Sequence, residues 1–184
     1  AVQAIASDGD VDEAYGLVSE AIDKNKLDIY YRFKSNLDAI RIQNLMAENR
    51  PPEEVREEFQ EYLQKAISSG LEATKLDKRD YQNWSNLGSI YQSIVALGVE
   101  GSIDNAIAQY DHALKYRPKS PTIYYAKAVL ERYRGNIDEA RSHIEQAITL
   151  RNQYTDAIFL LAQLQIAQNE TQQAINSVEA ITLF

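Results

Sequence analysis

The two histidines of this chain are its first candidates for metal binding or acid–base catalysis. His112 and His143 lie near corresponding places on two successive predicted helices. A catalytic or metal site needs several titratable groups that converge on one point, and no carboxylate cluster accompanies either histidine. Solvated helix faces explain both residues more simply, so we predict no catalytic residue and no metal site.

The other titratable cluster is an acidic run on a predicted helix. Glu53, Glu57 and Glu61 follow one another at four-residue steps with Arg56 between them, which is the spacing of a solvated helix face. The chain has no cysteine, and this excludes disulfides, thiol nucleophiles and thiolate metal sites. It also has no glycine-rich phosphate loop and no nucleophile elbow. The sequence therefore predicts a protein that is not an enzyme and uses no cofactor.

The charge balance restricts the partners of the chain. Its 184 residues carry a formal net charge of −8, with 45% apolar and 25% charged residues, as in a folded domain. Nucleic acids and anionic membranes attract basic proteins, so we expect neither as a partner. No stretch approaches the roughly 18 to 20 apolar residues of a membrane-spanning helix, so we expect no membrane insertion by this segment. The sequence leaves the cellular compartment open.

Five alanines mark an element that the chain repeats. Each is followed seven residues later by a second small or aliphatic residue, two turns along the same helix face. The first set is Ala14, Ala66, Ala106, Ala140 and Ala174, and the second is Ala21, Ala73, Ala113, Ala147 and Ile181. Members of the first set are 52, 40, 34 and 34 residues apart. A fixed period of this length indicates stacked helical hairpins, with insertions in the N-terminal half.

Residues 81–184 resemble the tetratricopeptide (TPR) repeat family. The matching residues are Tyr81, Trp84, Leu87, Gly88, Tyr91, Ala106, Tyr110, Ala113 and Pro118, then Tyr124, Ala128, Gly135, Ala140, Ile144 and Ala147, then Ile158, Leu161, Ala162, Ala174, Val178 and Ile181. Their types also have a physical reason. Small residues such as Gly88 and Ala128 let two helices approach closely, and Trp84 is expected to be buried in the space around them.

The resemblance implies an all-α fold, a right-handed α-solenoid of helix-turn-helix repeats that forms a single array over residues 1–184. The repeats are expected at 1–28 (partial), 29–80 (with a long insertion), 81–120 (with a short insertion at 92–102), 121–154 and 155–184. Residues 27–49 and a second stretch from Pro52 to about Leu76 predict an extended helical hairpin. A helix of this length reaches about 35 Å, beyond an ordinary repeat. Either Tyr30 or Tyr31 takes the place of Trp84 in it.

The first helix of each TPR repeat, helix A, lines a concave groove, and the resemblance assigns partner-binding positions there. They are Gln82, Ser85, Ser89, Gln92, Tyr125, Val129, Arg132, Tyr133, Phe159, Gln163 and Ile166. These positions lack the Lys and Asn set with which some TPR adaptors bind a terminal carboxylate. Their mixture of amides, hydroxyls, aromatic rings and one Arg suits an extended peptide or an amphipathic helix.

Three hypotheses for function follow. The first is a non-catalytic scaffold that binds a protein partner in the groove, with the hairpin at residues 27–78 as a second contact surface. The second rests on a weaker resemblance of residues 81–88, 96–101 and 154–163 to the TPR tails of bacterial O-antigen ligase and polymerase-like membrane proteins. This would be an extracytoplasmic tail. The third is self-association through an apolar C-terminal face, Val178 to Phe184.

Overall fold

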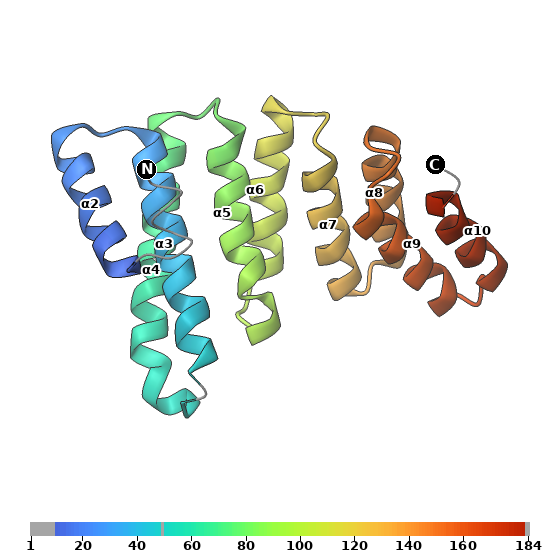
Figure 1. The fold of residues 1–184 in the computed structure, drawn as a ribbon, viewed down its shortest axis with the longest axis horizontal. Coiled ribbons are helices and arrows are strands. Elements are labelled where there is room, and N and C mark those ends of the chain that lie inside the picture. Colours follow the sequence, from blue (N-terminus) through green and yellow to red (C-terminus); the bar gives the residue numbers. More distant parts are fainter. Residues whose placement is uncertain (1–9, 49, 183–184) are drawn as a thin grey trace. The chain divides into compact units, whose positions relative to one another are not determined.

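The computed structural model describes residues 10–48 and 50–182, with side chains as far as Glu179. In this part of the chain there are nine α-helices, one short 3-10 helix and no strand, so the predicted all-α fold is confirmed (Figure 1). The chain divides into two compact units, residues 1–99 and 100–184. The division falls inside the predicted third repeat, and the predicted repeat boundaries stay a prediction. We describe each unit by itself.

The described residues of unit 1 form four α-helices and a short 3-10 helix. They are α2 (Val11–Lys24), α3 (Asp28–Ala47), α4 (Pro52–Leu76), α5 (Tyr81–Ser93) and η1 (Val95–Leu97). Side chains set the helix starts: the carboxylates of Asp10 and Asp80 cap α2 and α5, and Pro52 occupies the first turn of α4. Helices α3 and α4 have 20 and 25 residues and extend past the ends of α2 and α5 as a hairpin (Figure 1).

Unit 2 contains five α-helices. They are α6 (Ser102–Tyr116), α7 (Pro121–Arg134), α8 (Ile137–Leu150), α9 (Thr155–Ala167) and α10 (Thr171–Thr182). Helices α7 and α8 pack as one antiparallel hairpin and α9 and α10 as the next, as α3 and α4 do in unit 1. Gly135 ends α7 with φ of +90°, a left-handed conformation that glycine adopts at little cost.

The repeated alanines of the first and second sets lie in the core of both units. Ala66, Ala106 and Ala140 have no exposed surface, and Ala14 and Ala174 have almost none. The second set is buried at Ala73, Ala113 and Ala147, half-buried at Ala21, and outside the described side chains at Ile181. The predicted use of small residues where helices meet is therefore confirmed for the described positions.

In unit 1, the burial of Trp84 differs from the sequence prediction, and the register of α3, which the sequence left open, can be assigned. Trp84 is only half-buried, and its indole Nε1 donates to the carbonyl of Lys78 in the turn before α5. Asn83 is the fully buried residue instead. In α3, Ser35 is fully buried and lies four residues after Tyr31. Since Gly88 lies four residues after Trp84, this places Tyr31 at the Trp84-equivalent position.

A charged cluster joins α2, α3 and α4. The Arg41 guanidinium lies 3.9 Å from the centre of the Tyr15 ring and donates to Asp12 at 2.6 Å and to Asp38 at 3.1 Å. The Asp38 side chain is fully buried, and its Oδ2 atom has no hydrogen-bond partner among the described residues. Burial raises the pKa of Asp38, although Arg41 opposes the shift.

Replacement of Asp38 by Asn should change the pH dependence of stability. The raised pKa means that the folded state binds this proton more tightly than the unfolded state does. Stabilisation by that proton is present at low pH and is lost as the pH rises through the folded-state pKa. Asn does not titrate, so the free energy of unfolding of Asp38→Asn should increase relative to that of the wild type as the pH rises from about 4, the ordinary pKa of Asp, through the raised folded-state pKa. Urea titrations across this range measure the difference, and a constant difference would contradict the assignment.

Candidate functional site

The predicted groove positions of unit 1 lie along α5. Gln82 and Ser89 are exposed, and Ser85 and Gln92 are half-buried. They are accessible to solvent because the opposite face of α5, with Leu87 and Ile90, is buried. These four side chains are therefore placed where a ligand could reach them, and their binding role stays a prediction.

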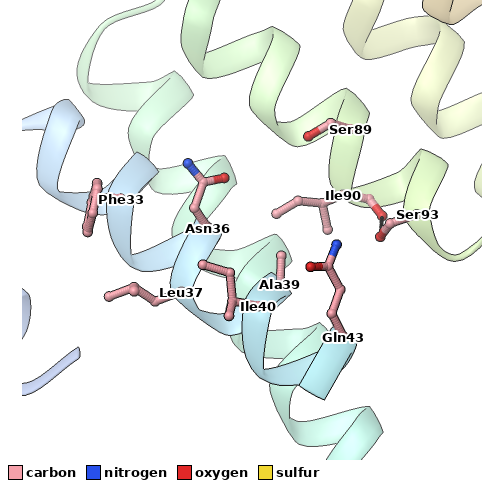
Figure 2. A pocket seen from close by; sticks show the side chains of 9 residues that line it. All are labelled: Phe33, Asn36, Leu37, Ala39, Ile40, Gln43, Ser89, Ile90 and Ser93. Atoms are coloured by element: carbon pink, nitrogen blue, oxygen red, sulfur yellow. Dashed lines mark hydrogen bonds between the residues drawn. The ribbon is translucent and has the colours of Figure 1, made fainter. Parts of the chain in front are cut away.

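A hollow of about 450 Å³ opens between α3 and α5 (Figure 2). It is lined by Phe33, Asn36, Leu37, Ala39, Ile40, Gln43, Ser89, Ile90 and Ser93. No charged side chain is among these residues. Figure 2 shows the carboxamides of Asn36 and Gln43 pointing from α3 toward α5. We call this the α3–α5 hollow.

Some polar groups of the α3–α5 hollow already make hydrogen bonds within the protein, and others do not. The hydroxyls of Ser89 and Ser93 donate to carbonyls of their own helix, at Asn86 and Ile90, both at 2.8 Å. The carboxamides of Asn36 and Gln43 make no hydrogen bond to any described residue. Each carboxamide offers both a donor and an acceptor, which is the pattern that a peptide backbone presents in return.

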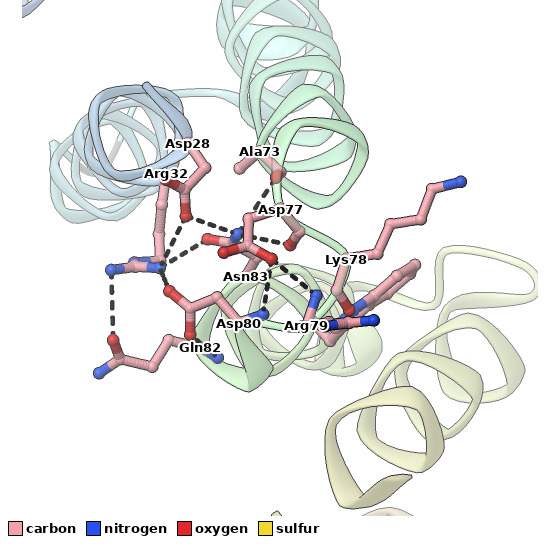
Figure 3. A network of polar contacts seen from close by, with 10 residues as sticks. Asp28, Arg32, Ala73, Asp77, Lys78, Arg79, Asp80, Gln82 and Asn83 are labelled. Carbon is pink, nitrogen blue, oxygen red and sulfur yellow. Dashed lines mark hydrogen bonds and ion pairs between the residues drawn. The ribbon is translucent and has the colours of Figure 1, made fainter. Parts of the chain in front are cut away.

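A polar network holds α3, α4 and α5 together at one end of the hairpin (Figure 3). Arg32 on α3 donates to Asp80 at 2.5 Å, to Asn83 at 2.6 Å and to Gln82 at 3.3 Å. The Asn83 amide donates to Asp28 at 2.9 Å and to the carbonyls of residues 73 and 77, both at 3.1 Å. The network fixes α5 against α3, and it reaches the groove position Gln82.

The predicted groove positions of unit 2 lie on α7 and α9. Tyr133 on α7 and both Phe159 and Ile166 on α9 are large apolar residues with about half of their surface exposed, at 59%, 49% and 59%. Arg132 donates from Nη1 to Oε1 of Gln163 at 3.2 Å, and this bond joins the two helices on that surface. The structure thus brings predicted positions of two successive repeats together within unit 2.

Two further predicted groove positions of unit 2, Tyr125 and Val129, are half-buried. The Tyr125 ring lies 5.2 Å from the Tyr154 ring, centre to centre. Burial raises the pKa of the Tyr125 hydroxyl, and nearby Asp156 raises it further. This hydroxyl therefore remains protonated at neutral pH and is available as a hydrogen-bond donor.

The histidines do not meet in a site. Both are half-buried, so the helix faces that carry them are only partly solvated. The His143 ring lies 6.1 Å from the Tyr124 ring, and burial, followed by the charge of Lys127, lowers the pKa of His143. In the part of the chain that the structure describes, no group of three or more His, Asp or Glu residues could hold a metal ion.

The described part of the C-terminal face is apolar. A hollow of about 300 Å³ is lined there by Ala162, Ile166, Thr171, Ala174, Ile175, Val178 and Glu179. The rest of the predicted face, from Ala180 to Phe184, lies outside the described side chains. Self-association through this face stays a prediction.

Sequence reasoning missed the α3 wall of the α3–α5 hollow. Phe33, Asn36, Ile40 and Gln43 are spaced by three, four and three residues, which places them on one helix face. This spacing was the signal available in the sequence. The groove positions were carried over only to the three repeats with the closer resemblance, and the register of α3 was open by one residue.

Comparisons with known proteins agree with the helical-repeat fold. Two tetratricopeptide repeat family models match the chain, over residues 95–155 and 131–184. The crystal structure of MamA is 14% identical, with 98% of this chain and 92% of that chain covered and a TM-score of 0.73. A thermophilic TPR protein of Thermus thermophilus is 14% identical, with 93% and 81% covered and a TM-score of 0.66. YrrB, a TPR protein with an unusual peptide-binding site, is 12% identical, with 98% and 80% covered and a TM-score of 0.64.

At these identities the solved structures show a shared fold. No curated protein matches the chain. The expected resemblance to O-antigen ligase tails gains no support from the comparisons, which return TPR proteins instead. Over the described residues, no helix combines the length and the apolar character that crossing a membrane requires.

Proposed function

We propose, on the premise that this chain is a tetratricopeptide repeat protein, that it is a non-catalytic scaffold that binds a peptide or helix of a partner protein through its helix A surfaces. TPR proteins generally mediate protein–protein interactions, and their repeat scaffold is typically non-catalytic. The proposal adds where the partner binds and what chemistry it brings. The groove positions predicted from the sequence are part of the proposal.

The observation that carries this proposal is the α3–α5 hollow. Its floor is apolar, with Phe33, Leu37 and Ile40, and two carboxamides without partners stand on the same wall. An apolar side chain of a peptide can enter the hollow while Asn36 and Gln43 bond the peptide backbone on either side. Because no charge lines the hollow, a charged side chain would lose hydration there without compensation. We infer that the bound segment is apolar and uncharged at this position.

The α7 and α9 surface of unit 2 supports the same function with different chemistry. Tyr133, Phe159 and Ile166 offer apolar contact area, and aromatic residues are enriched where proteins bind one another. Arg132 already donates to Gln163 and can donate a second hydrogen bond to a peptide carbonyl or carboxylate. The two surfaces therefore favour ligands of different chemistry.

Loss of the two carboxamides should weaken peptide binding. We expect the double variant Asn36→Ala/Gln43→Ala to bind peptides selected on the wild-type protein at least about tenfold more weakly, the loss of about 1.4 kcal/mol. Two net hydrogen bonds account for a change of this size. The measurement is fluorescence anisotropy with peptides taken from a random display library. The same assay on a triple replacement of Tyr125, Arg132 and Phe159 by Ala tests the surface of unit 2.

The matched control is Asn44→Ala/Gln146→Ala. It also removes two exposed carboxamides, from α3 and α8, but neither lines the α3–α5 hollow. We expect this control to bind as the wild type does. Equal affinities for the control, for the Asn36 and Gln43 variant and for the triple variant would refute groove binding.

A further inference from the structure

The two insertions that break the repeat period come together at one place in unit 1. A second hollow, of about 340 Å³, lies at the tip of the α3–α4 hairpin. It is lined by Leu45, Met46, Arg50, Pro52, Val55, Arg56, Phe59, Gln60 and Leu97. All but Leu97 belong to the long insertion, and Leu97 belongs to the short one. We call it the tip pocket, and it shares no residue with the α3–α5 hollow.

The short insertion is built to present Leu97. Ile94 and Val95 are buried and hold η1 in place, and Gly98 ends η1 in the left-handed conformation with φ of +70°. Leu97 between them is 47% exposed, and Met46 on the hairpin side of the pocket is 44% exposed. Two large apolar side chains thus face water across a pocket whose floor is also apolar. An exposed apolar patch of this kind is typical of an interaction site.

The charges in the tip pocket are both positive, and only one of them is balanced. Arg50 donates to Glu48 at 3.3 Å and to Glu58 at 3.1 Å, and these bonds raise the pKa of Arg50. Arg56 is exposed and makes no ion pair or hydrogen bond with any described residue. A ligand with a carboxylate next to its apolar anchor would supply the missing partner.

The apolar surface continues from the tip pocket along α4. A shallower hollow of about 360 Å³ shares Gln60 with the tip pocket and is lined further by Leu63, Gln64, Ile67, Ser68 and Leu71. Val55, Phe59, Leu63, Ile67 and Leu71 therefore form one row at four-residue steps. A row of this kind forms a ridge against which a second helix packs.

We propose that the tip pocket and this α4 row form a second protein-binding site, which takes the apolar face of an amphipathic helix from a partner protein. A carboxylate on that helix, next to its apolar anchor, pairs with Arg56. Glu53 and Glu57 lie three residues before and one residue after Arg56 on the same helix, and their charges disfavour a strongly acidic ligand helix. The preferred ligand is therefore a mainly apolar helix with a single acidic residue. This site does not depend on binding in the α3–α5 hollow.

The only methionine of the chain makes the site directly observable. Met46 lines the tip pocket, so ¹³C-methyl labelling of methionine gives one NMR signal, and this signal reports occupancy of the pocket. The probes are two synthetic helical peptides of about 18 residues, long enough to span the α4 row. Both carry Leu at every fourth position, and they differ by one Glu or Lys beside the central Leu. We expect the Glu peptide to shift the Met46 signal with an affinity at least about fivefold higher than that of the Lys peptide.

Three variants test the assignment. Arg56→Glu should reverse the preference between the Glu and Lys peptides, and Leu97→Ser should weaken both by about tenfold. The matched control is Leu17→Ser on α2, where a leucine of equal exposure, 48%, lies outside the pocket. It should change neither affinity.

Either of two results would overturn the proposal. The first is no shift of the Met46 signal with either peptide at millimolar concentration. The second is that the wild-type protein prefers the Lys peptide, or binds both peptides equally, and that Arg56→Glu does not change this result. Because Asn36 and Gln43 are intact in every protein used, a negative result here leaves groove binding standing, and the carboxamide variants test that separately.

Discussion

Replacement of Asn83 by Ala should lower the free energy of unfolding by about 3 kcal/mol, because it removes the hydrogen bonds by which this buried side chain joins α5 to α3 and to the end of α4. Asn83 has no exposed surface, and its side chain bonds four groups at once. Its carbonyl accepts from Arg32, and the two N–H groups of its amide are shared among Asp28 and two backbone carbonyls at the end of α4. Alanine makes none of these bonds.

The measurement is equilibrium unfolding in urea. Trp84, the only tryptophan of the chain, is the next residue and reports this region by fluorescence, while far-UV circular dichroism reports all helices. Gln82→Ala is the control, since Gln82 is exposed and makes one long bond to Arg32 at 3.3 Å. That control should change stability by less than about 0.5 kcal/mol. Similar losses in both variants would show that the network is not held together by Asn83.

A second replacement separates the donors of Asn83 from its acceptor. Asn83→Asp keeps an oxygen for Arg32 but turns the amide that faces Asp28 into a carboxylate oxygen, 2.9 Å from the oxygen of Asp28. Two like charges at this distance repel each other strongly in a buried site. We therefore expect Asn83→Asp to be at least as unstable as Asn83→Ala at neutral pH. A variant as stable as the wild type would contradict the bond assignment.

The repeat architecture could be predicted from the sequence because its signal is local and periodic. Ala66 and Ala73, or Ala140 and Ala147, are two turns apart on one helix, and only small side chains allow the close helix contacts in which they lie. The helix starts at Pro52 and Pro121 are equally local. Such features need no knowledge of which distant residues meet.

The Asn83 network could not be predicted, because its members are far apart in the chain. Arg32 and Asn83 are separated by 51 residues and Asp28 and Asn83 by 55. Nothing in the neighbourhood of Asn83 distinguishes a buried hub from an exposed helix residue. The sequence instead predicted burial of the neighbouring Trp84, because it is large and aromatic. Trp84 is only half-buried and lies across the α4–α5 turn.

Of the candidate binding surfaces, the groove positions could be predicted from the sequence, and the tip pocket could not. Exposed groove positions such as Tyr133 and Phe159 follow from the repeat register, and their binding role stays a prediction. The tip pocket required knowledge that residues near Leu45 and Phe59 meet Leu97, which only the folded unit provides. The sequence marked both insertions as departures from the period but gave no sign that they share a pocket.

Gly70→Val should be strongly destabilising, because three helices meet at this glycine. A Cβ atom at residue 70 would lie 3.0 Å from Cδ1 of Leu87 and 3.2 Å from Oγ of Ser35. Neither neighbour can move freely. Leu87 has no exposed surface, and the Ser35 hydroxyl donates to the carbonyl of Ala66 at 2.7 Å and accepts from Asn86.

Valine adds two further carbons to this crowded position, so α3 and α5 must both shift away from α4. Overpacking of this kind costs about 1 to 3 kcal/mol, and we expect a loss near the upper end, about 3 kcal/mol, in urea unfolding. Gly70→Ala should fall within about 1 kcal/mol of the wild type, since the higher helix propensity of alanine offsets the crowding of one carbon. The difference between the two variants measures how tightly the helices meet.

Gly16→Val is the matched control for this effect. Gly16 also lies inside a helix, α2, but a Cβ atom there would meet nothing within 4 Å. The same substitution should therefore change stability by no more than about 0.5 kcal/mol, in the stabilising direction, because valine forms helix slightly better than glycine does. A loss at Gly16 equal to that at Gly70 would assign the effect to the branched side chain in a helix. A loss at Gly70 alone assigns it to the contact of α4 with α3 and α5.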